Sequence, residues 1–319
     1  MCCLFLAASS TVAIAQTSVV DLVNPIIGTN GMGHTFPGAC VPFGLVQLSP
    51  DTDTIPHNVD GKYQPRSYEY CAGYQHKDSS IVGFSHTHFS GTGHSDLGDI
   101  LIMPTTGTLK LNPGTATNPD GGYRSRFSHG TEISRPGYYE VMLTDYGVKA
   151  QLTTTQRVGI HKYTYPTNSE NQRIILDMIH GIYNYDGKVL WTNIRVENDT
   201  LVTGYRITNG WARTNYTYFA MSFSKPITHY GCEEKAKVNY RGGYAKFNMK
   251  ENFPNIGGRK IVAYFDFDPK TSDELEVKVA LSGVSTEGAL KNLRAEASGA
   301  DFDQLAAKAS DTWNKALSV

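Results

Sequence analysis

The feature that most constrains this chain is a long series of short apolar or alternating segments, most of them five to eight residues long. Turn-forming clusters such as Asn112-Pro-Gly, Asn118-Pro-Asp-Gly-Gly and Arg135-Pro-Gly separate them. The predicted strands cover residues 109–111, 138–144, 148–155, 159–165, 173–178, 201–207, 218–223, 244–247, 260–267 and 275–281. About a dozen strands joined by short turns predict a mainly β fold, a large antiparallel β-sandwich.

The spacing of apolar residues changes after residue 284 from a period of two to a period of 3.6, which predicts two helices. Ser285 is a suitable N-cap for the first, and Gly299 can end it in the left-handed conformation. Asp301 is the expected cap of the second helix. Its apolar stripe is formed by Phe302, Leu305, Ala309, Trp313 and Ala316. These helices follow the sandwich and would pack against it.

The start of the chain has the pattern of an export signal. Residues 3–15 are an apolar run that ends in Ala13-Ile14-Ala15, a small-x-small cleavage pattern before Gln16. We therefore predict a signal peptide over residues 1–15, and a periplasmic, cell-surface or secreted protein. No later segment reaches the ~20 apolar residues of a membrane span. The net charge of -1 gives no reason to expect a nucleic-acid partner.

Residues 68–104 have the composition of a binding site more than that of a core. Four of the ten histidines lie there, together with three aspartates and three tyrosines. Aromatic faces beside short polar side chains suit a sugar ring, which has an apolar face and a hydroxyl edge. The three tyrosines Tyr68, Tyr70 and Tyr74, with Cys71 between them, are therefore candidate ligand-binding residues.

The same stretch, taken with residues 24–51, which begin Asn24-Pro-Ile-Ile-Gly-Thr-Asn-Gly-Met-Gly-His-Thr-Phe-Pro-Gly, resembles the N-terminal domain of glycoside hydrolase family 92. The resemblance covers nearly all of the chain after residue 16. It implies a calcium-dependent, inverting exo-α-mannosidase that acts on α-mannosides of glycans. It also implies a division into the N-terminal β-sandwich domain at 16–284 and linker helices at 285–319, which in the family lead to a C-terminal α/α-barrel.

That barrel supplies the general acid, the general base and the calcium ligands in the family. We therefore assign no catalytic residue and no metal ligand in this chain, and expect calcium to be bound by a C-terminal domain that these residues lack. The 319 residues alone are expected to be inactive. A glycan-binding module without chemistry, and a structural subunit for a separately encoded barrel, are the alternatives.

The resemblance also suggests what the sandwich contributes, namely one wall of the sugar pocket. In the family, aromatic residues at the positions of Tyr68 to Tyr74 help to shape the mannose subsite, and tryptophan is common at Tyr68 or Tyr70. The other interpretation is that these tyrosines pack between sheet and loop. His34 lies in a glycine-rich loop and is a candidate for the pocket rim, or caps a buried carbonyl group.

His86 and His88 complete the candidate substrate-binding residues. If they lay in a strand, both rings would project from one face, so a zinc site with His94, Asp96 or Asp99 as third ligand is conceivable. We favour hydrogen bonds that hold the Gly91-Thr-Gly93 loop, because the family metal is calcium, which prefers oxygen ligands. Asp51 and Asp53 are expected to be exposed residues of a turn.

Overall fold

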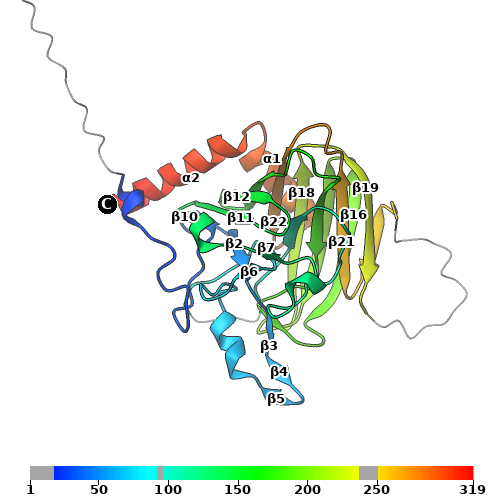
Figure 1. The fold of residues 1–319 in the computed structure, drawn as a ribbon, viewed down its shortest axis with the longest axis horizontal. Helices are drawn as coiled ribbons and strands as arrows, with labels where there is room; N and C mark the ends of the chain where they lie inside the picture. The colour runs from blue at the N-terminus through cyan, green and yellow to red at the C-terminus, as the bar shows by residue number, and fades with distance from the viewer. Residues whose placement is uncertain (1–17, 92–95, 237–250, 319) are drawn as a thin grey trace, which may run out of the picture.

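Two large antiparallel sheets pack face to face in this computed structural model, which describes residues 18–91, 96–236 and 251–318 (Figure 1). The first sheet has seven strands in the order β1 (Ala39–Cys40), β2 (Gln47–Asp51), β7 (Gly83–Ser85), β8 (Leu101–Thr105), β14 (Gln172–Asp177), β21 (Ile261–Phe267) and β19 (Ile227–Glu234). The predicted mainly β sandwich is confirmed.

The second sheet has nine strands and carries the longest pairings. Its order is β10 (Ile133–Arg135), β11 (Tyr138–Leu143), β12 (Val148–Thr154), β13 (Val158–Thr164), β22 (Glu274–Ser282), β18 (Asn215–Phe223), β17 (Leu201–Thr208), β16 (Val189–Asn198) and β20 (Asn255–Gly258). Alternation fixes which side chains face the first sheet, because a strand has a period of two. In β22, Val277 and Val279 join the core between the sheets, whereas Ala280 faces the helices.

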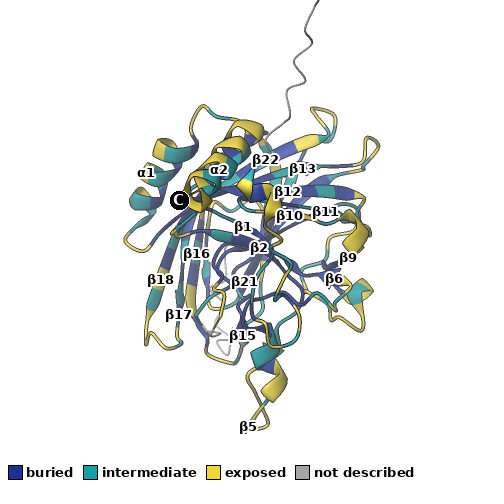
Figure 2. Ribbon diagram, turned by 90° about the vertical axis from the view of Figure 1, so that its left-hand side faces the viewer, coloured by how far each residue is buried: buried dark blue, intermediate teal, exposed yellow. Residues whose placement is uncertain are grey.

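Short elements connect the strands of the two sheets. Three two-stranded ribbons pair β3 (Ile55–Pro56) with β15 (Tyr183–Asn184), β4 (Asn58–Val59) with β5 (Lys62–Tyr63), and β6 (Ser80–Ile81) with β9 (Ser125–Arg126). Four 3-10 helices are η1 (Val19–Leu22), η2 (Pro65–Tyr70), η3 (Pro119–Gly121) and η4 (His129–Thr131). Figure 2 shows the buried strands of both sheets surrounded by more exposed loops and helices.

The two predicted helices are confirmed, with their caps. α1 (Thr286–Ala297) begins where the Ser285 hydroxyl accepts the Gly288 N–H, and Gly299 has a positive φ of 75°. α2 (Phe302–Leu317) begins with a capping box formed by Asp301 and Gln304. Both helices cover the outer face of the nine-stranded sheet, where their apolar residues pack on Val158, Ile160, Ala220 and Ala280.

Most predicted strands are confirmed, and one is wrong. Residues 109–111 form no strand, since this short segment leads directly into the Asn112-Pro-Gly turn, whose Asn112 carbonyl accepts the Tyr123 N–H. The predicted strand at 244–247 and the predicted signal peptide at 1–15 lie outside the described residues. In the part of the chain that the structure describes, no helix combines the length and the apolar character needed to cross a membrane.

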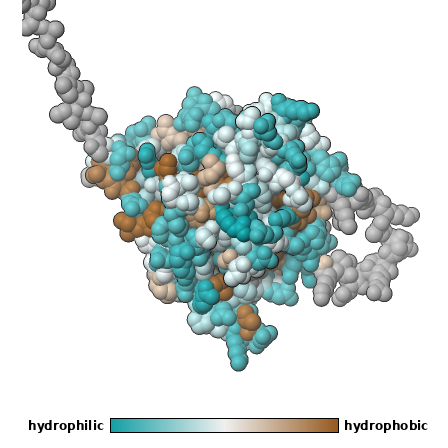
Figure 3. Space-filling model, viewed as in Figure 1, coloured by the Kyte–Doolittle hydropathy of each residue, from teal (hydrophilic) through white to brown (hydrophobic). Residues whose placement is uncertain are grey.

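Apolar side chains remain exposed where η1 and the end of α2 meet, at the left of Figure 3. Leu22 is 76% exposed and Ile27 is 74% exposed. A groove of about 260 Å³ beside them is lined by Val23, Phe36, Trp313 and Leu317, among others. Trp313 is held there by a hydrogen bond of 2.6 Å from its indole N–H to the carbonyl of Cys40.

Candidate functional site

Three of the predicted site residues, His34, Tyr68 and Cys71, lie where the 28–36 loop, η2 and the loop after β7 meet. His34 has a positive φ of 53°, and its carbonyl accepts the N–H of Gly91 at 2.7 Å. Its ring packs edge-on against Tyr68, with 4.7 Å between ring centroids. Nε2 of His34 is buried and has no hydrogen-bond partner among the described residues. A buried polar atom of this kind is expected to meet a ligand or an ordered water molecule.

The tyrosines of this stretch differ in exposure. Tyr68 is half-buried, whereas Tyr70 and Tyr74 are 2% and 1% exposed. The Tyr70 hydroxyl donates to Asp78 at 2.9 Å, and the Tyr74 hydroxyl donates to Glu132 at 2.9 Å. Burial and the neighbouring carboxylates raise the pKa of both phenols, which therefore stay neutral donors. Of the three rings, Tyr68 is the most exposed.

Cys71 and His88 are both buried. The Cys71 thiol is buried, with Sγ 3.9 Å from the carbonyl oxygen of Gly91. His88 Nε2 lies 2.8 Å from Oδ1 of Asp51, and His88 Nδ1 lies 2.8 Å from the carbonyl oxygen of Gln47. His88 therefore fixes the loop after β7 against the end of β2, and it has no surface of its own to offer a ligand.

Asp51 is the centre of a fully buried polar cluster. Its second oxygen accepts from His180 Nε2 at 2.8 Å and from the Ser85 hydroxyl at 2.6 Å. Burial raises the pKa of Asp51, but the charges of His88 and His180 and their hydrogen bonds outweigh this effect and hold the pKa well below its usual range. The carboxylate is thus ionised. The expectation of an exposed turn is wrong for Asp51, which is 0% exposed.

Gly73 makes room for this cluster. It has a positive φ of 82°, and a Cβ there would lie 2.1 Å from Oδ1 of Asp51 and 3.0 Å from the His88 ring. Any larger residue would therefore displace the carboxylate as well as strain the backbone. The glycine that the sequence places inside the tyrosine stretch is explained by this contact.

His86 belongs to a different network, which joins the two sheets. Its Nδ1 lies 2.6 Å from the carbonyl oxygen of Ile100, and its Nε2 lies 3.0 Å from Nε2 of His161 on β13. His161 Nδ1 in turn lies 2.8 Å from the Tyr163 hydroxyl. Because a carbonyl only accepts, His86 carries its proton on Nδ1, His161 carries its proton on Nε2, and Tyr163 donates to His161.

The pKa directions agree with this assignment of protons. Burial lowers the pKa of His86 to about 4, and it lowers the pKa of His161 well below its usual value, so both rings are neutral near pH 7. Gly159 lies on the same face of β13, two residues before His161. A Cβ at Gly159 would approach the His86 ring to 2.7 Å, so the missing side chain lets that ring enter between the sheets.

The prediction that His86 and His88 project from one face of a strand is wrong. β7 ends at Ser85, and the two rings enter separate hydrogen-bond networks because the chain turns after that residue. A shared zinc site at these two histidines is excluded by this divergence. His94, one suggested third ligand, lies outside the described residues. Both rings are hydrogen-bonded to backbone carbonyl groups, as the other interpretation expects, but not to each other. Thr92 and Gly93 of the loop that they were expected to hold lie outside the described residues.

A third buried group was not anticipated from sequence. Arg206 on β17 is 0% exposed and pairs with Asp99 at 2.8 Å, while Asp99 also accepts from the Thr87 hydroxyl at 2.9 Å. Lys188 is buried nearby, and its Nζ has no hydrogen-bond partner among the described residues. Burial and the charge of Arg206 lower the pKa of Lys188 to about 7. Arg206 thus ties the nine-stranded sheet to the segment before β8.

Some signal for Arg206 was present in the sequence. Alternation along β17 places Arg206 on the same face as Val202, which belongs to the core between the sheets. A buried arginine requires an acidic partner, and Asp99 is one of the three aspartates of residues 68–104. His180 offered no comparable signal, because it follows the end of β14 in an irregular segment.

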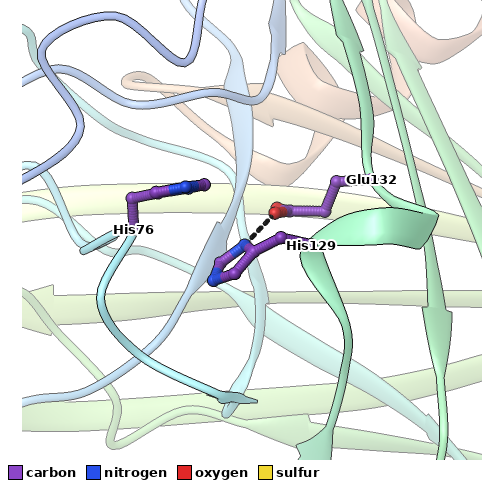
Figure 4. Close-up of side chains that lie close together, drawn as sticks. All are labelled: His76, His129 and Glu132. Atoms are coloured by element: carbon purple, nitrogen blue, oxygen red, sulfur yellow. Dashed lines mark hydrogen bonds and ion pairs between the residues drawn. The ribbon is translucent and has the colours of Figure 1, made fainter.

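One group of described residues could hold a metal ion. His76, His129 and Glu132 offer three donor atoms that all lie within 4.8 Å of one another (Figure 4). Two of these donors are imidazole nitrogens. Calcium takes six to eight oxygen ligands, so this group does not fit calcium.

Comparisons with known proteins agree with the architecture. A family model described as the glycosyl hydrolase family 92 N-terminal domain matches residues 22–282. The structure of a family GH92 α-mannosidase from Bacteroides thetaiotaomicron in complex with mannoimidazole has 41% sequence identity and a TM-score of 0.82. That match covers 94% of this chain and 37% of the mannosidase.

Two further relatives extend the comparison. A second structure from Bacteroides thetaiotaomicron, a family GH92 inverting mannosidase, has 26% identity and a TM-score of 0.70, over 93% of this chain and 36% of its own. An uncharacterized secreted glycosidase of Arthroderma benhamiae is 24% identical over 98% of this chain and 39% of its own length. The chain therefore spans less than two fifths of the relatives it matches.

Proposed function

Because the chain belongs to glycoside hydrolase family 92, we propose that it is the N-terminal part of an exported, calcium-dependent, inverting α-mannosidase. Its substrates are α-mannosides of glycans, and its β-sandwich contributes one wall of the sugar pocket. The observation that carries this proposal is the similarity, at 41% identity over nearly the whole chain, to an α-mannosidase whose structure contains mannoimidazole.

The wall that we propose consists of Tyr68 and His34. The half-buried Tyr68 ring offers a flat apolar face, and the adjacent His34 Nε2 offers a buried polar atom without a protein partner. A sugar needs this combination, since it packs its ring carbon atoms on an aromatic face and directs its hydroxyl groups to polar atoms. Tyr70, Cys71, Tyr74, His86 and His88 would support the wall from beneath without touching the sugar.

Inverting hydrolysis requires two carboxyl groups roughly 6.5 to 9.5 Å apart, one as general acid and the other as general base. We propose that both groups, together with the calcium ligands, come from a C-terminal α/α-barrel domain, as the family resemblance implies. In support, the three-donor group that the described residues offer is rich in nitrogen and unsuited to calcium. Bound calcium would supply a fixed positive charge for orienting sugar hydroxyl groups.

A C-terminal domain would find a suitable surface on this chain. The exposed apolar residues of η1 and the end of α2 lie together with the groove beside Trp313 (Figure 3). Exposed apolar patches of this kind mark sites of protein contact. We propose that the C-terminal domain covers this patch when both parts are present.

The proposal is tested by expressing the complete gene and measuring mannose release from α-1,2-, α-1,3-, α-1,4- and α-1,6-linked mannobiosides. We expect release of β-mannose as the first product, observed by proton NMR, because inversion changes the anomeric configuration. Removal of calcium with EGTA should abolish hydrolysis, and added calcium should restore it. The 319-residue chain alone should release no mannose.

Two outcomes would contradict the proposal. Retention of the α configuration would exclude the inverting mechanism, and hydrolysis that survives EGTA would exclude the calcium requirement. Calorimetry with α-mannosides on the complete gene product distinguishes the alternative function, a glycan-binding module without chemistry. If the complete gene product binds α-mannosides but does not hydrolyse them, the chain is part of a glycan-binding protein.

A further inference from the structure

We propose that His76, His129 and Glu132 form a binding site for a divalent transition metal ion of the zinc type. Figure 4 shows His76 on the loop before β6 and the other two residues at η4, with the side chains directed toward one another. This inference is independent of the proposed glycosidase function. It concerns a site on the sandwich itself, apart from the calcium ligands expected elsewhere.

The three donor residues lie around the Tyr74 hydroxyl, which is hydrogen-bonded to Glu132. Oη of Tyr74 lies 3.5 Å from Nδ1 of His76 and 3.5 Å from Nδ1 of His129. It lies 2.9 and 3.0 Å from the two carboxylate oxygens of Glu132. Two imidazole nitrogens and a carboxylate therefore lie within 4.8 Å of one another beside this hydroxyl, although they come from segments more than 50 residues apart in sequence.

Glu132 is held in place in the manner of a metal ligand. Its side chain is only 4% exposed, and the hydroxyls of Tyr74 and Tyr139 both donate to Oε1, at 2.9 and 2.5 Å. Ligating carboxylates are commonly fixed by such outer hydrogen bonds. Oε2 is shared with Nδ1 of His129 at 2.5 Å, which shows that these two donors already lie close together.

The kind of donor selects the kind of metal. Two imidazoles and one glutamate are a donor set of catalytic zinc sites, which leave a fourth position to water. Hard cations such as calcium and magnesium prefer oxygen ligands, so two nitrogens disfavour them. His129 is 37% exposed, which gives an ion a path from solvent and leaves room for the fourth ligand.

The distances require a small closure when the ion binds. Bonds of about 2.0–2.1 Å in a tetrahedron place donor atoms about 3.3 Å apart. In the structure the three donor atoms lie within 4.8 Å of one another, and the two imidazole centroids are 4.0 Å apart. Rotation of the His76 and His129 side chains, which are partly exposed, can supply this change without moving the buried Glu132.

A simple ion pair between His129 and Glu132 is the competing explanation. It accounts for their short contact but gives His76 no part, although the His76 ring packs against His129. Protonation of both imidazoles would place two like charges side by side, whereas a bound ion uses both rings in their neutral form. The metal interpretation therefore makes His76 necessary, and the ion-pair interpretation does not.

Binding would join two segments that support the tyrosine stretch. His76 follows directly on Tyr74 and Gln75, and its N–H donates to the carbonyl of Thr29 at 2.9 Å. Glu132 lies just before β10, at the edge of the nine-stranded sheet. A metal ion between them would fix the 74–78 segment to that sheet edge, and so would stabilise the folded chain.

The test uses the purified chain after treatment with EDTA, removal of the chelator and incubation with Zn²⁺. We expect it to retain about one equivalent of Zn²⁺ after dialysis, measured by mass spectrometry of the metal. Saturating Zn²⁺ should raise the melting temperature by roughly 3 °C or more, because an ion that binds only the folded state stabilises it. Co²⁺ should give the visible absorption of a four-coordinate site, and Ca²⁺ should change neither quantity.

Two single variants and a matched control decide between the explanations. His76→Ala and His129→Ala should each lose the bound Zn²⁺ and the rise in melting temperature. His229→Ala should lose neither, since His229 is similarly exposed at 39% and pairs with Asp266, but lies on β19 away from the cluster. The substitutions are at partly exposed rings, so circular dichroism should show all three variants folded.

Retention of Zn²⁺ by the His76→Ala variant would overturn the proposal, as would failure of the wild-type chain to retain zinc. Binding that is lost equally in His229→Ala would show non-specific association with surface histidines and would overturn it too. Loss of zinc in Glu132→Gln, with the variant still folded, would add support by assigning the third ligand.

Discussion

The interior of the sandwich and the candidate site contain the same residue types, but their histidines differ in hydrogen bonding and exposure. Inside, His86 and His161 are completely buried, and every nitrogen of the pair has a partner. In the candidate site, Nε2 of His34 has no hydrogen-bond partner among the described residues. The His129 side chain at the rim is 37% exposed. The exposure of a histidine and its hydrogen-bond partners therefore decide whether it stabilises the fold or is available to a ligand.

The same contrast between interior and candidate site separates Asp51 from the wall formed by Tyr68 and His34. The Asp51 carboxylate makes three hydrogen bonds inside the protein and has no contact with solvent. Tyr68 is half-buried and packs on a single aromatic neighbour in the wall. We infer that interior substitutions should cost stability, whereas rim substitutions should cost ligand binding.

The largest effect is expected for Asp51→Ala. This change leaves the imidazoles of His88 and His180 facing a cavity without their carboxylate, so we expect the free energy of unfolding to fall by about 3–5 kcal/mol. Urea unfolding followed by circular dichroism measures it. Asp53→Ala is the matched control, because Asp53 is partly exposed and contacts Arg124 at a longer 3.4 Å, and it should cost about 1 kcal/mol or less. Equal losses of unfolding free energy in the two variants would contradict the distinction between interior and exposed carboxylates.

The buried histidine pair should make stability depend on pH. The folded-state pKa of His86 is about 4, below its usual value of 6.5, so the unfolded chain binds more protons between these two pH values. Stability present above pH 6.5 should therefore be lost as the pH falls toward 4, by on the order of 3 kcal/mol from His86 alone. Urea unfolding at several pH values measures the slope.

A double variant tests the source of that slope. His86→Gln with His161→Gln removes both titrating groups, and it should flatten the dependence between pH 6.5 and 4 even though stability at pH 7 is lower. If the double variant kept the wild-type slope, the acid sensitivity would come from other groups.

A smaller effect separates Tyr70 from Tyr68. Tyr70→Phe removes the hydroxyl that donates to Asp78 but keeps the ring, so we expect a loss of about 1–2 kcal/mol in unfolding free energy. The kcat/KM of the complete gene product toward α-mannosides should stay the same, because the hydroxyl is buried. A fall in kcat/KM at unchanged stability would place the Tyr70 hydroxyl in contact with the sugar.

The sequence predicted the elements well because each of them is encoded locally. The predicted strands that the structure confirms follow apolar runs or alternation, and the caps Ser285 and Asp301 are read from single residues beside an apolar stripe. The strands β16 and β19 were not predicted. The failure at residues 109–111 has a local reason as well, since three residues before a proline turn are too few to hold a strand.

The site was less predictable because its contacts are distant in sequence. His180 meets Asp51 across 129 positions, and Arg206 meets Asp99 across 107. A pattern within one strand does not show which side chain lies opposite in the other sheet. The composition of residues 68–104 indicated a polar centre correctly, but it did not distinguish buried Tyr70 and Tyr74 from the more exposed Tyr68.

The most direct test of this division between interior and rim is Tyr68→Ala in the complete gene product. We predict that kcat/KM toward α-mannobiosides falls about fivefold or more, from the loss of about 1 kcal/mol of stacking, while the melting temperature changes little. Tyr216→Ala, at an exposed tyrosine of β18, should change neither quantity. A large fall in melting temperature with unchanged kcat/KM would show that Tyr68 belongs to the packing, and it would contradict the account.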